Sequence, residues 1–220
     1  SDADAYSLSI DEVVTRAQEA WDLGATEVCL QGGIDPQIPA SHYLDLVRAI
    51  SAALPELHIH AFSPMEVATG AAHARTSIPD FLAALQEAGL GSLPGTAAEI
   101  LDDEVRWVLT KGKLPTATWI EVVESAHQLG LPTSSTMMFG HVETIEDRIE
   151  HLERLRVQQD KSKGFTAFIG WTFQAEHTKL RAPTVGAHDY LRTQALGRIY
   201  LDNFENVQSS WVTQGPDIGQ

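Results

Sequence analysis

Short apolar runs recur along the chain, and each of them ends in a cluster of small and polar residues. Six such runs begin near residues 26, 57, 89, 133, 165 and 207. The stretches between them carry apolar residues at helical spacing. Strands that alternate with helices at a step of about 36 residues predict βαβ units and a parallel sheet.

The helical stretches carry their own start and stop signals. Ser9 and Glu12 form a capping-box pattern before the first stretch, and Gly24 follows its end. A second such pattern, Thr144 with Asp147, precedes a later stretch. The predicted helices cover residues 10–23, 40–54, 78–88, 101–109, 116–129, 144–159 and 187–201.

Six βα units favour a barrel over other α/β folds. A closed barrel of eight units takes about 250 residues. The chain has 220 residues. We therefore expect an incomplete (β/α) barrel with about six visible units, its first and last strands missing. No linker-like segment divides the chain, which favours one domain over residues 1–220, truncated at both ends. The alternative is an open doubly wound sheet, which predicts a G-x-G-x-x-G loop after the first strand; none occurs there.

Composition and charge disfavour nucleic acid and membranes as partners of this chain. The formal net charge is −15, which disfavours nucleic acid because phosphate binding needs a basic face. No apolar run approaches the roughly 18–20 residues of a membrane span, so we expect no membrane contact. Cys29 is the single cysteine, and its mid-strand position predicts a buried core residue. Without disulfides, a cytoplasmic protein acting on a small molecule is the default expectation.

The first two strand ends offer small and acidic residues. In a barrel of this kind the loops after the strands carry the chemistry. Gln31, Gly32 and Gly33 follow the first strand and let a ligand approach the backbone closely, although a plain turn explains them as well. Ser63 and Glu66 end the second strand, where they are either site residues or the start of a helix.

The third strand end carries Glu99. This carboxylate could hold the hydroxyls of a ribose, or it could form a capping box with Thr96 three residues earlier. On the helix that follows, Arg106 is expected to pair with Asp102 or Asp103 on a solvated face.

The later strand ends are richer in aromatic side chains. Phe139, Gly140 and His141 end the fourth strand; Phe139 could pack on a purine or belong to the core, and His141 could be an acid or base or bind a nearby carbonyl. On the second strand, His60 shares a face with His58 two residues away. The last two strand ends supply flat walls and neutral donors, namely Trp171, Gln174, His177 and Trp211.

Four segments together resemble a known family. They are Gln31-Gly-Gly-Ile-Asp-Pro, His60-Ala-Phe-Ser-Pro-Met-Glu, Gly95-Thr-Ala-Ala-Glu-Ile-Leu and Thr136-Met-Met-Phe-Gly-His. The chain is similar to the radical S-adenosylmethionine (SAM) enzymes that include the futalosine branch of menaquinone biosynthesis and deazaflavin (FO) synthase. Residues 4–125 look most like the tyrosine-using subunit of FO synthase, and residues 126–220 most like cyclic dehypoxanthine futalosine synthase.

The second half carries more weight, because the later strand ends supply much of the substrate wall, and its resemblance implies radical cyclisation of dehypoxanthine futalosine. One alternative is the FO synthase subunit that joins tyrosine to a ribitylaminouracil. Another is a nucleoside-binding barrel without cluster or catalysis.

The resemblance also implies cofactors and residue roles. SAM and a four-iron four-sulfur cluster would serve the full-length enzyme, with flavodoxin or ferredoxin as electron donor. Gln31, Gly32, Gly33, Ser63, Glu66, Glu99, Phe139 and Gly140 would bind SAM. His60, Trp171, Gln174 and Trp211 would face the substrate, and His141 and His177 would be catalytic.

One departure from the family affects the cluster. The family holds it with a C-x-x-x-C-x-x-C loop, because thiolates are the iron ligands. This chain has Cys29 alone. We therefore expect no metal ligands here and an N-terminally cut fragment that cannot assemble the cluster.

Overall fold

The computed structural model describes residues 6–176 and 178–219. Its strands are β1 (Glu27–Leu30), β2 (His58–Ala61), β3 (Thr133–Phe139), β4 (Phe165–Thr172) and β5 (Val207–Ser209). Its helices are α1 (Ile10–Asp22), α2 (Ala40–Ala53), α3 (Pro64–Ala74), α4 (Ile78–Ala88), α5 (Asp103–Leu109), α6 (Thr116–Gln128), α7 (Ile145–Ser162), α8 (Ala187–Tyr200), α9 (Trp211–Gln214) and α10 (Pro216–Gly219).

Local capping bonds explain why most helices begin where the sequence predicts. The Ser9 hydroxyl accepts a hydrogen bond from the Glu12 amide, and the Glu12 carboxylate accepts one from the Ser9 amide at 2.8 Å. Thr144 and Asp147 repeat this capping box at α7. The helix predicted from residue 101 instead begins at Asp103, because the side chain of Asp102 caps it.

The strands are parallel and form two groups. β1 pairs with β2, and β3, β4 and β5 pair in that order. The third apolar run, which the sequence predicts to be a strand, lies between the two groups. It makes two isolated parallel bridges instead, from Ser92 to His60 and from Leu93 to Thr133. Pro94 follows at once and has no N–H to continue a ladder. These bridges still connect the two groups into one parallel series.

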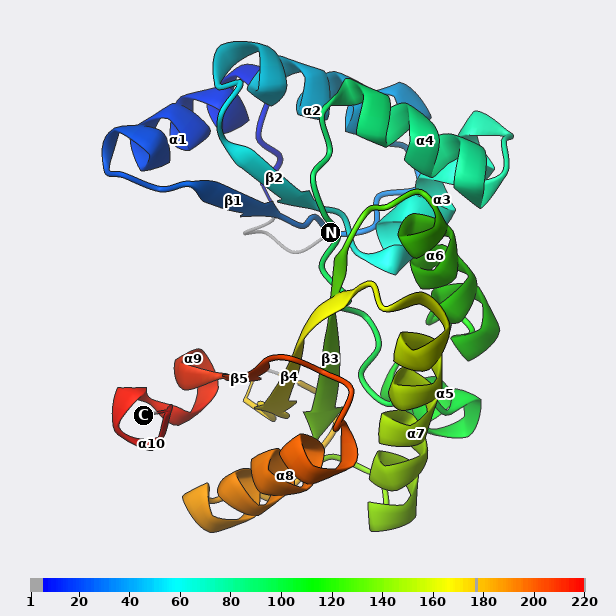
Figure 1. Cartoon of the computed structure of the whole chain (residues 1–220), viewed down its shortest axis with the longest axis vertical. Coiled ribbons are helices and arrows are strands. Elements are labelled where there is room, and N and C mark those ends of the chain that lie inside the picture. Colours follow the sequence, from blue (N-terminus) through cyan, green and yellow to red (C-terminus); the bar gives the residue numbers. More distant parts are fainter. Residues whose placement is uncertain (1–5, 177, 220) are drawn as a thin grey trace.

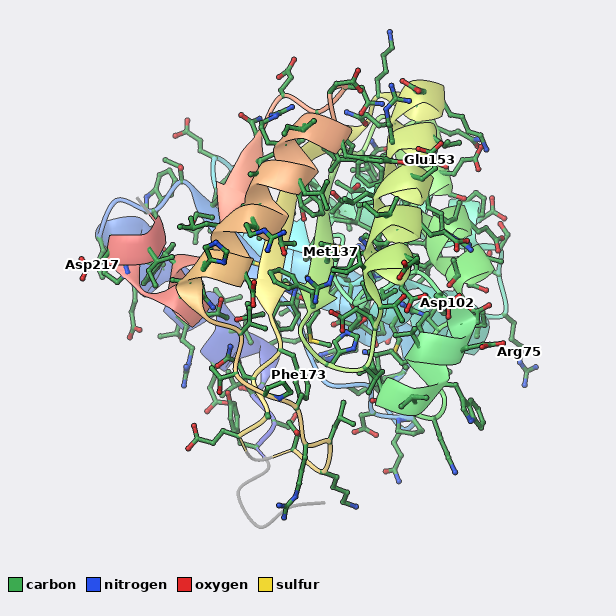
Figure 2. The ribbon with its side chains drawn as sticks, turned by 90° about the horizontal axis from the view of Figure 1, so that it is seen from below. Arg75, Asp102, Met137, Glu153, Phe173 and Asp217 are labelled. Atoms are coloured by element: carbon green, nitrogen blue, oxygen red, sulfur yellow. The ribbon has the colours of Figure 1, made fainter. Side chains whose placement is uncertain are left out.

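Figure 1 shows the strands as an inner arc, with helices α1 to α8 along its outer side. The buried apolar residues lie between strands and helices, as Ile59 and Ala61 do on β2. In Figure 2, Met137 of β3 lies inside the molecule, whereas Glu153 of α7 lies at its periphery. A doubly wound sheet would carry helices on both faces, so that alternative is wrong. The incomplete (β/α) barrel is confirmed, and a single domain over residues 1–220 stays a prediction.

The inner side of the arc carries polar residues. His58 and His60 share this face of β2, as predicted, and a ring nitrogen of each lies 2.7 Å from the Ser92 hydroxyl oxygen. Burial lowers the pKa of His60, an effect that nearby Glu27 opposes. Throughout the described part of the chain, no helix has the length and apolarity that crossing a membrane requires.

Candidate active site

A pocket of about 500 Å³ lies where the strand ends converge. The carboxyl ends of parallel strands meet at one edge, so residues far apart in sequence come together there. The pocket brings together seven of the predicted site residues, which are Gln31, Gly32, Gly33, Ser63, Glu66, Glu99 and Trp171. Sequence reasoning did not assign Ile34, Met65 or Ala97, which also line it.

The Glu66 side chain joins the Gly32 turn, which lines the pocket, to the start of α3. One carboxylate oxygen accepts hydrogen bonds from the Ser63 amide at 2.8 Å and the Ser63 hydroxyl at 2.7 Å, which completes the capping box of α3. The other oxygen accepts one from the Gly32 amide at 2.9 Å. Burial raises the pKa of Glu66, and the hydrogen bonds from Ser63 and Gly32 oppose that effect. The helix-start interpretation is therefore confirmed, and the same side chain also fixes the turn after β1.

We expect Glu66→Ala to loosen this turn. The free energy of unfolding should fall by about 2 kcal/mol, because the Ser63 and Gly32 amides lose their acceptor. Amide hydrogen exchange at Gly32 should accelerate about tenfold or more. Glu12→Ala is the matched control, since it removes an exposed capping box at α1 and should leave Gly32 exchange unchanged. Unaltered Gly32 exchange in Glu66→Ala would contradict the link to the turn.

Glu99 does not cap a helix, so the capping-box interpretation of Thr96 and Glu99 is wrong. The Thr96 hydroxyl donates to the Gln31 side chain at 2.6 Å, which joins the third strand end to the first. Glu99 has a φ of +44°. Its carboxylate lies 2.6 Å from the Lys113 amine and 3.9 Å from Arg106. The helix begins later because Asp102 caps it in place of Thr96.

Arg106 also departs from the expectation of a solvated ion pair with Asp102 or Asp103. Its side chain is 2% exposed. The guanidinium N–H groups donate to the backbone carbonyls of Ala97, Ala98, Ile100 and Leu114. Backbone carbonyls from two separate segments thus surround one guanidinium, and helical spacing in the sequence does not reveal such an arrangement.

The end of β3 and the turn that follows it do not line the pocket. Phe139 is fully buried and packs on the rings of Tyr190 and the guanidinium of Arg148. A Cβ on Gly140 would collide with the Val185 side chain. Phe139 and Gly140 therefore do not reach the pocket in this structure, and Phe139 is a core residue.

The His141 ring follows the alternative in which it binds a nearby carbonyl. Its Nε2 lies 3.0 Å from the Met138 carbonyl oxygen, and its Nδ1 lies 2.9 Å from the Glu143 carboxylate. The ring is fully buried, which leaves no nitrogen directed at a ligand. Its predicted acid–base role has no support in this geometry.

Glu143 was missed by sequence reasoning and organises this segment. Its carboxylate is fully buried and accepts hydrogen bonds from the Gly140 amide, the His141 amide and Arg148. Burial raises the pKa of Glu143, but the hydrogen bonds and charge of His141, with the Gly140 amide, outweigh it and lower the pKa to about 2. An acidic residue three positions after a glycine was the signal available in the sequence.

We expect Glu143 to make stability depend on pH. Its folded pKa lies below the unfolded value of 4.5, so its stabilisation is complete above that pH and is lost as the pH falls toward 2. The free energy of unfolding should fall by roughly 3 kcal/mol over this window, about 2 kcal/mol of it by pH 3. Urea denaturation between pH 7 and pH 3 measures it, with Glu143→Gln as control. Equal pH dependence in both proteins would contradict the assignment.

The remaining predicted residues lie outside the pocket lining. The Gln174 amide donates to the Thr172 hydroxyl at 3.0 Å, and Trp211 on α9 is 61% exposed. His60 contacts Ser92 on the inner face of β2. His177 lies outside the described residues. Their roles toward a substrate stay predictions.

Cys29 is exposed, so its predicted burial is wrong. Within the described residues β1 pairs with β2 alone, and the side chain points to the uncovered inner side of the arc. One thiol cannot replace the set of thiolates that an iron–sulfur cluster requires. Among the residues described, no group of three or more His, Cys, Asp or Glu side chains is placed to hold a metal ion. The residues of this chain therefore do not fit the cluster.

The pocket does fit SAM. Gly33 has open space where a Cβ would stand, so a ligand can approach the backbone there. One carboxylate oxygen of Glu99 is buried and has no hydrogen-bond partner within residues 6–176 and 178–219. A ligand hydroxyl would satisfy it. The volume also lies in the range of small-molecule sites.

Comparison with protein families identifies the class to which this fold and pocket belong. Residues 2–155 match the radical SAM superfamily, and residues 162–220 match the CofH/MqnC C-terminal region. The chain belongs to the radical SAM superfamily, which confirms the resemblance seen in the sequence. In this superfamily SAM acts with a four-iron four-sulfur cluster.

The chain is similar over its length to curated proteins of one kind. It is 53% identical to an FO synthase of Mycobacterium tuberculosis, over 97% of this chain and 26% of that protein. It is 50% identical to an FO synthase of Streptomyces coelicolor, over 99% of this chain and 26% of that protein. It is 44% identical to a 5-amino-6-(D-ribitylamino)uracil–L-tyrosine 4-hydroxyphenyl transferase of Methanothermobacter thermautotrophicus, over 100% of this chain and 62% of that protein. The chain thus spans about a quarter of the FO synthases it matches.

A solved structure supports the fold. Methylornithine synthase superposes with a TM-score of 0.67 at 18% identity, over 98% of this chain and 65% of that one.

These relatives correct the expected function. Cyclic dehypoxanthine futalosine synthase is wrong as the main interpretation, because the relatives are FO synthases and a tyrosine-using transferase. The error came from residues 126–220. A single family model covers the C-terminal region of both enzymes, so motifs in that half do not distinguish them. The likeness of the first half to the tyrosine-using subunit is supported.

Proposed function

We propose that this chain supplies the SAM pocket and part of the substrate site of an FO synthase-type transferase. The reaction would join a group from L-tyrosine to 5-amino-6-(D-ribitylamino)uracil. The observation that carries this proposal is the 44% identity to the named transferase across the whole of this chain. The convergence of seven predicted residues on one pocket supports the proposal.

In the proposed site, three residues of this chain would contribute to ligand binding in different ways. Glu66 holds the Gly32 amide, which keeps the glycine turn in place beneath the ligand. Glu99 would accept a hydrogen bond from a ribose hydroxyl at its unpartnered oxygen. Trp171 would form a flat wall for an aromatic group. SAM, when bound, would supply the carbon-centred radical that this superfamily uses.

The iron–sulfur cluster and the electron donor would involve groups outside this chain. The thiolates for the cluster would come from outside these 220 residues, since the chain has one cysteine. A flavodoxin or ferredoxin would be the electron donor. A reducing compartment such as the cytosol suits an iron–sulfur enzyme with a single thiol in this region.

A chimera tests the proposed function. The segment of the Methanothermobacter transferase that aligns with this chain is replaced by these 220 residues. After iron and sulfide reconstitution, the chimera receives SAM, a reductant, L-tyrosine and 5-amino-6-(D-ribitylamino)uracil. We expect the joined product by mass spectrometry.

A chimera carrying Glu99→Ala is the control, and its product formation should fall by about tenfold or more because one charge-assisted hydrogen bond is lost. A folded, cluster-containing chimera that leaves both substrates unchanged would overturn the proposal.

A further inference from the structure

The two carboxylate oxygens of Glu99 are used differently. Oε1 accepts a hydrogen bond from the Lys113 amine at 2.6 Å. Oε2 is buried and has no hydrogen-bond partner among residues 6–176 and 178–219. The carboxylate lines the pocket. One oxygen is therefore held, and the other lacks a hydrogen-bond donor.

Arg106 adds charge near Oε2 without satisfying it. The nearest guanidinium nitrogen lies 3.9 Å away, beyond hydrogen-bond distance. Its N–H groups are already donated to backbone carbonyls, including those of Ala97 and Leu114. Arg106 thus adds positive charge beside the carboxylate but leaves Oε2 without a hydrogen-bond donor.

Lys113 determines the direction in which this carboxylate points. It follows α5 in a turn where Gly112 has a φ of +87°. The Lys113 and Glu99 side chains are 19% and 12% exposed, so solvent competes little for their hydrogen bond. Glu99 itself has a φ of +44°, and its carboxylate meets the Lys113 amine from this turn.

We propose that Lys113 is a specificity-determining positioning residue. By holding Oε1 it presents Oε2 at a fixed place, where it selects a ligand that carries a hydroxyl donor on its sugar. Without Lys113 the carboxylate rotates, and both oxygens are shared between solvent and Arg106. The inference rests on the proposed function in one respect, because it takes the ligand to be a nucleoside of the SAM type.

A binding titration tests this inference without turnover. The full chain is titrated with S-adenosylhomocysteine and with its 2′,3′-dideoxy analogue, and ligand-observed NMR gives both dissociation constants. We expect the native chain to prefer the hydroxylated ligand by about 10- to 100-fold, as one charge-assisted hydrogen bond would give. Lys113→Met should reduce that preference to about threefold or less. Lys113→Arg, which keeps a charged donor, should retain most of it.

Two further variants make the test specific. Lys111→Met removes an exposed charge two residues away and should keep the full preference. Lys113→Gln keeps a neutral donor and should give an intermediate preference, and it replaces Lys113→Met if thermal unfolding shows that Met is not tolerated. A purely structural role would change stability while leaving the ratio of the two constants unchanged.

The outcomes separate this inference from the proposed function. Native discrimination that survives Lys113→Met, or its replacement Lys113→Gln, overturns the role of Lys113. Binding without discrimination in the native chain overturns it as well, but leaves a SAM pocket. No binding of either ligand overturns both the pocket assignment and this inference, whereas failure of the chimera alone concerns only the transferase reaction.

Discussion

Arg106→Met should lower the free energy of unfolding by about 3–5 kcal/mol, the largest loss we expect from a single side chain here. The guanidinium is buried, and it is the donor for the carbonyls of Ala97, Ala98, Ile100 and Leu114. Met can fill part of the space but donates no hydrogen bond, so these carbonyls lose their donor and Glu99 loses a nearby positive charge.

Urea denaturation at pH 7 measures this loss. Arg106→Lys should recover less than half of the lost free energy of unfolding, because a single amine cannot reach all the carbonyls that the planar guanidinium contacts. Arg48→Met is the matched control, since Arg48 pairs with Asp45 on an exposed helix face and should change stability by less than about 0.5 kcal/mol. A loss below about 1 kcal/mol in Arg106→Met would show that the loop holds its shape without the guanidinium.

Gly95→Ala should be the second severe substitution, with a loss of about 3 kcal/mol or more. A Cβ at Gly95 would lie 2.7 Å from the carbonyl carbon of Ser134 and 2.9 Å from the Cα of Ser135, and it would collide with the Ser134 carbonyl oxygen. These are backbone atoms of β3, which pairs along its length with β4. Neither side can move without breaking hydrogen bonds.

The measurement for Gly95→Ala combines denaturation with hydrogen exchange. The Ser134 amide, which donates to the Leu93 carbonyl at 3.1 Å, should exchange faster by about tenfold or more. Gly33→Ala is the control, because nothing lies within 4 Å of its Cβ position, and its stability should stay within about 0.5 kcal/mol of native. Native stability in Gly95→Ala would mean that the third strand end can withdraw from β3.

Much of the fold could be predicted because its signals are local. Ser9 with Glu12, and Thr144 with Asp147, are capping partners three residues apart, and the structure forms both. The alternation of strand and helix predicted the barrel for a similar reason. The third run was the exception, since its two bridges depend on neighbours on both sides and Pro94 limits them.

The sequence predicted which residues lie near the strand ends, but it did not predict which of them reach the pocket. Gln31 and Glu66 reach the pocket because strand ends meet at one edge. Phe139 ends β3 and His141 follows it in the next turn, yet both side chains are buried. No spacing rule separates these cases, because the direction of each turn is set by partners such as Glu143 and Arg148.

The sequence by itself determined most of the helices, the caps of α1 and α7, the alternation of strands and helices, and the superfamily, because each follows from residues close together or from a joint pattern. Only the tertiary structure decided that Glu66 supports the Gly32 turn, that Glu99 pairs with Lys113 and that Arg106 is buried. The physical reason is the same for all three. A buried charged side chain must be paired, and the fold brings it partners that are distant in the sequence. Helical spacing predicts only partners within the same helical turn.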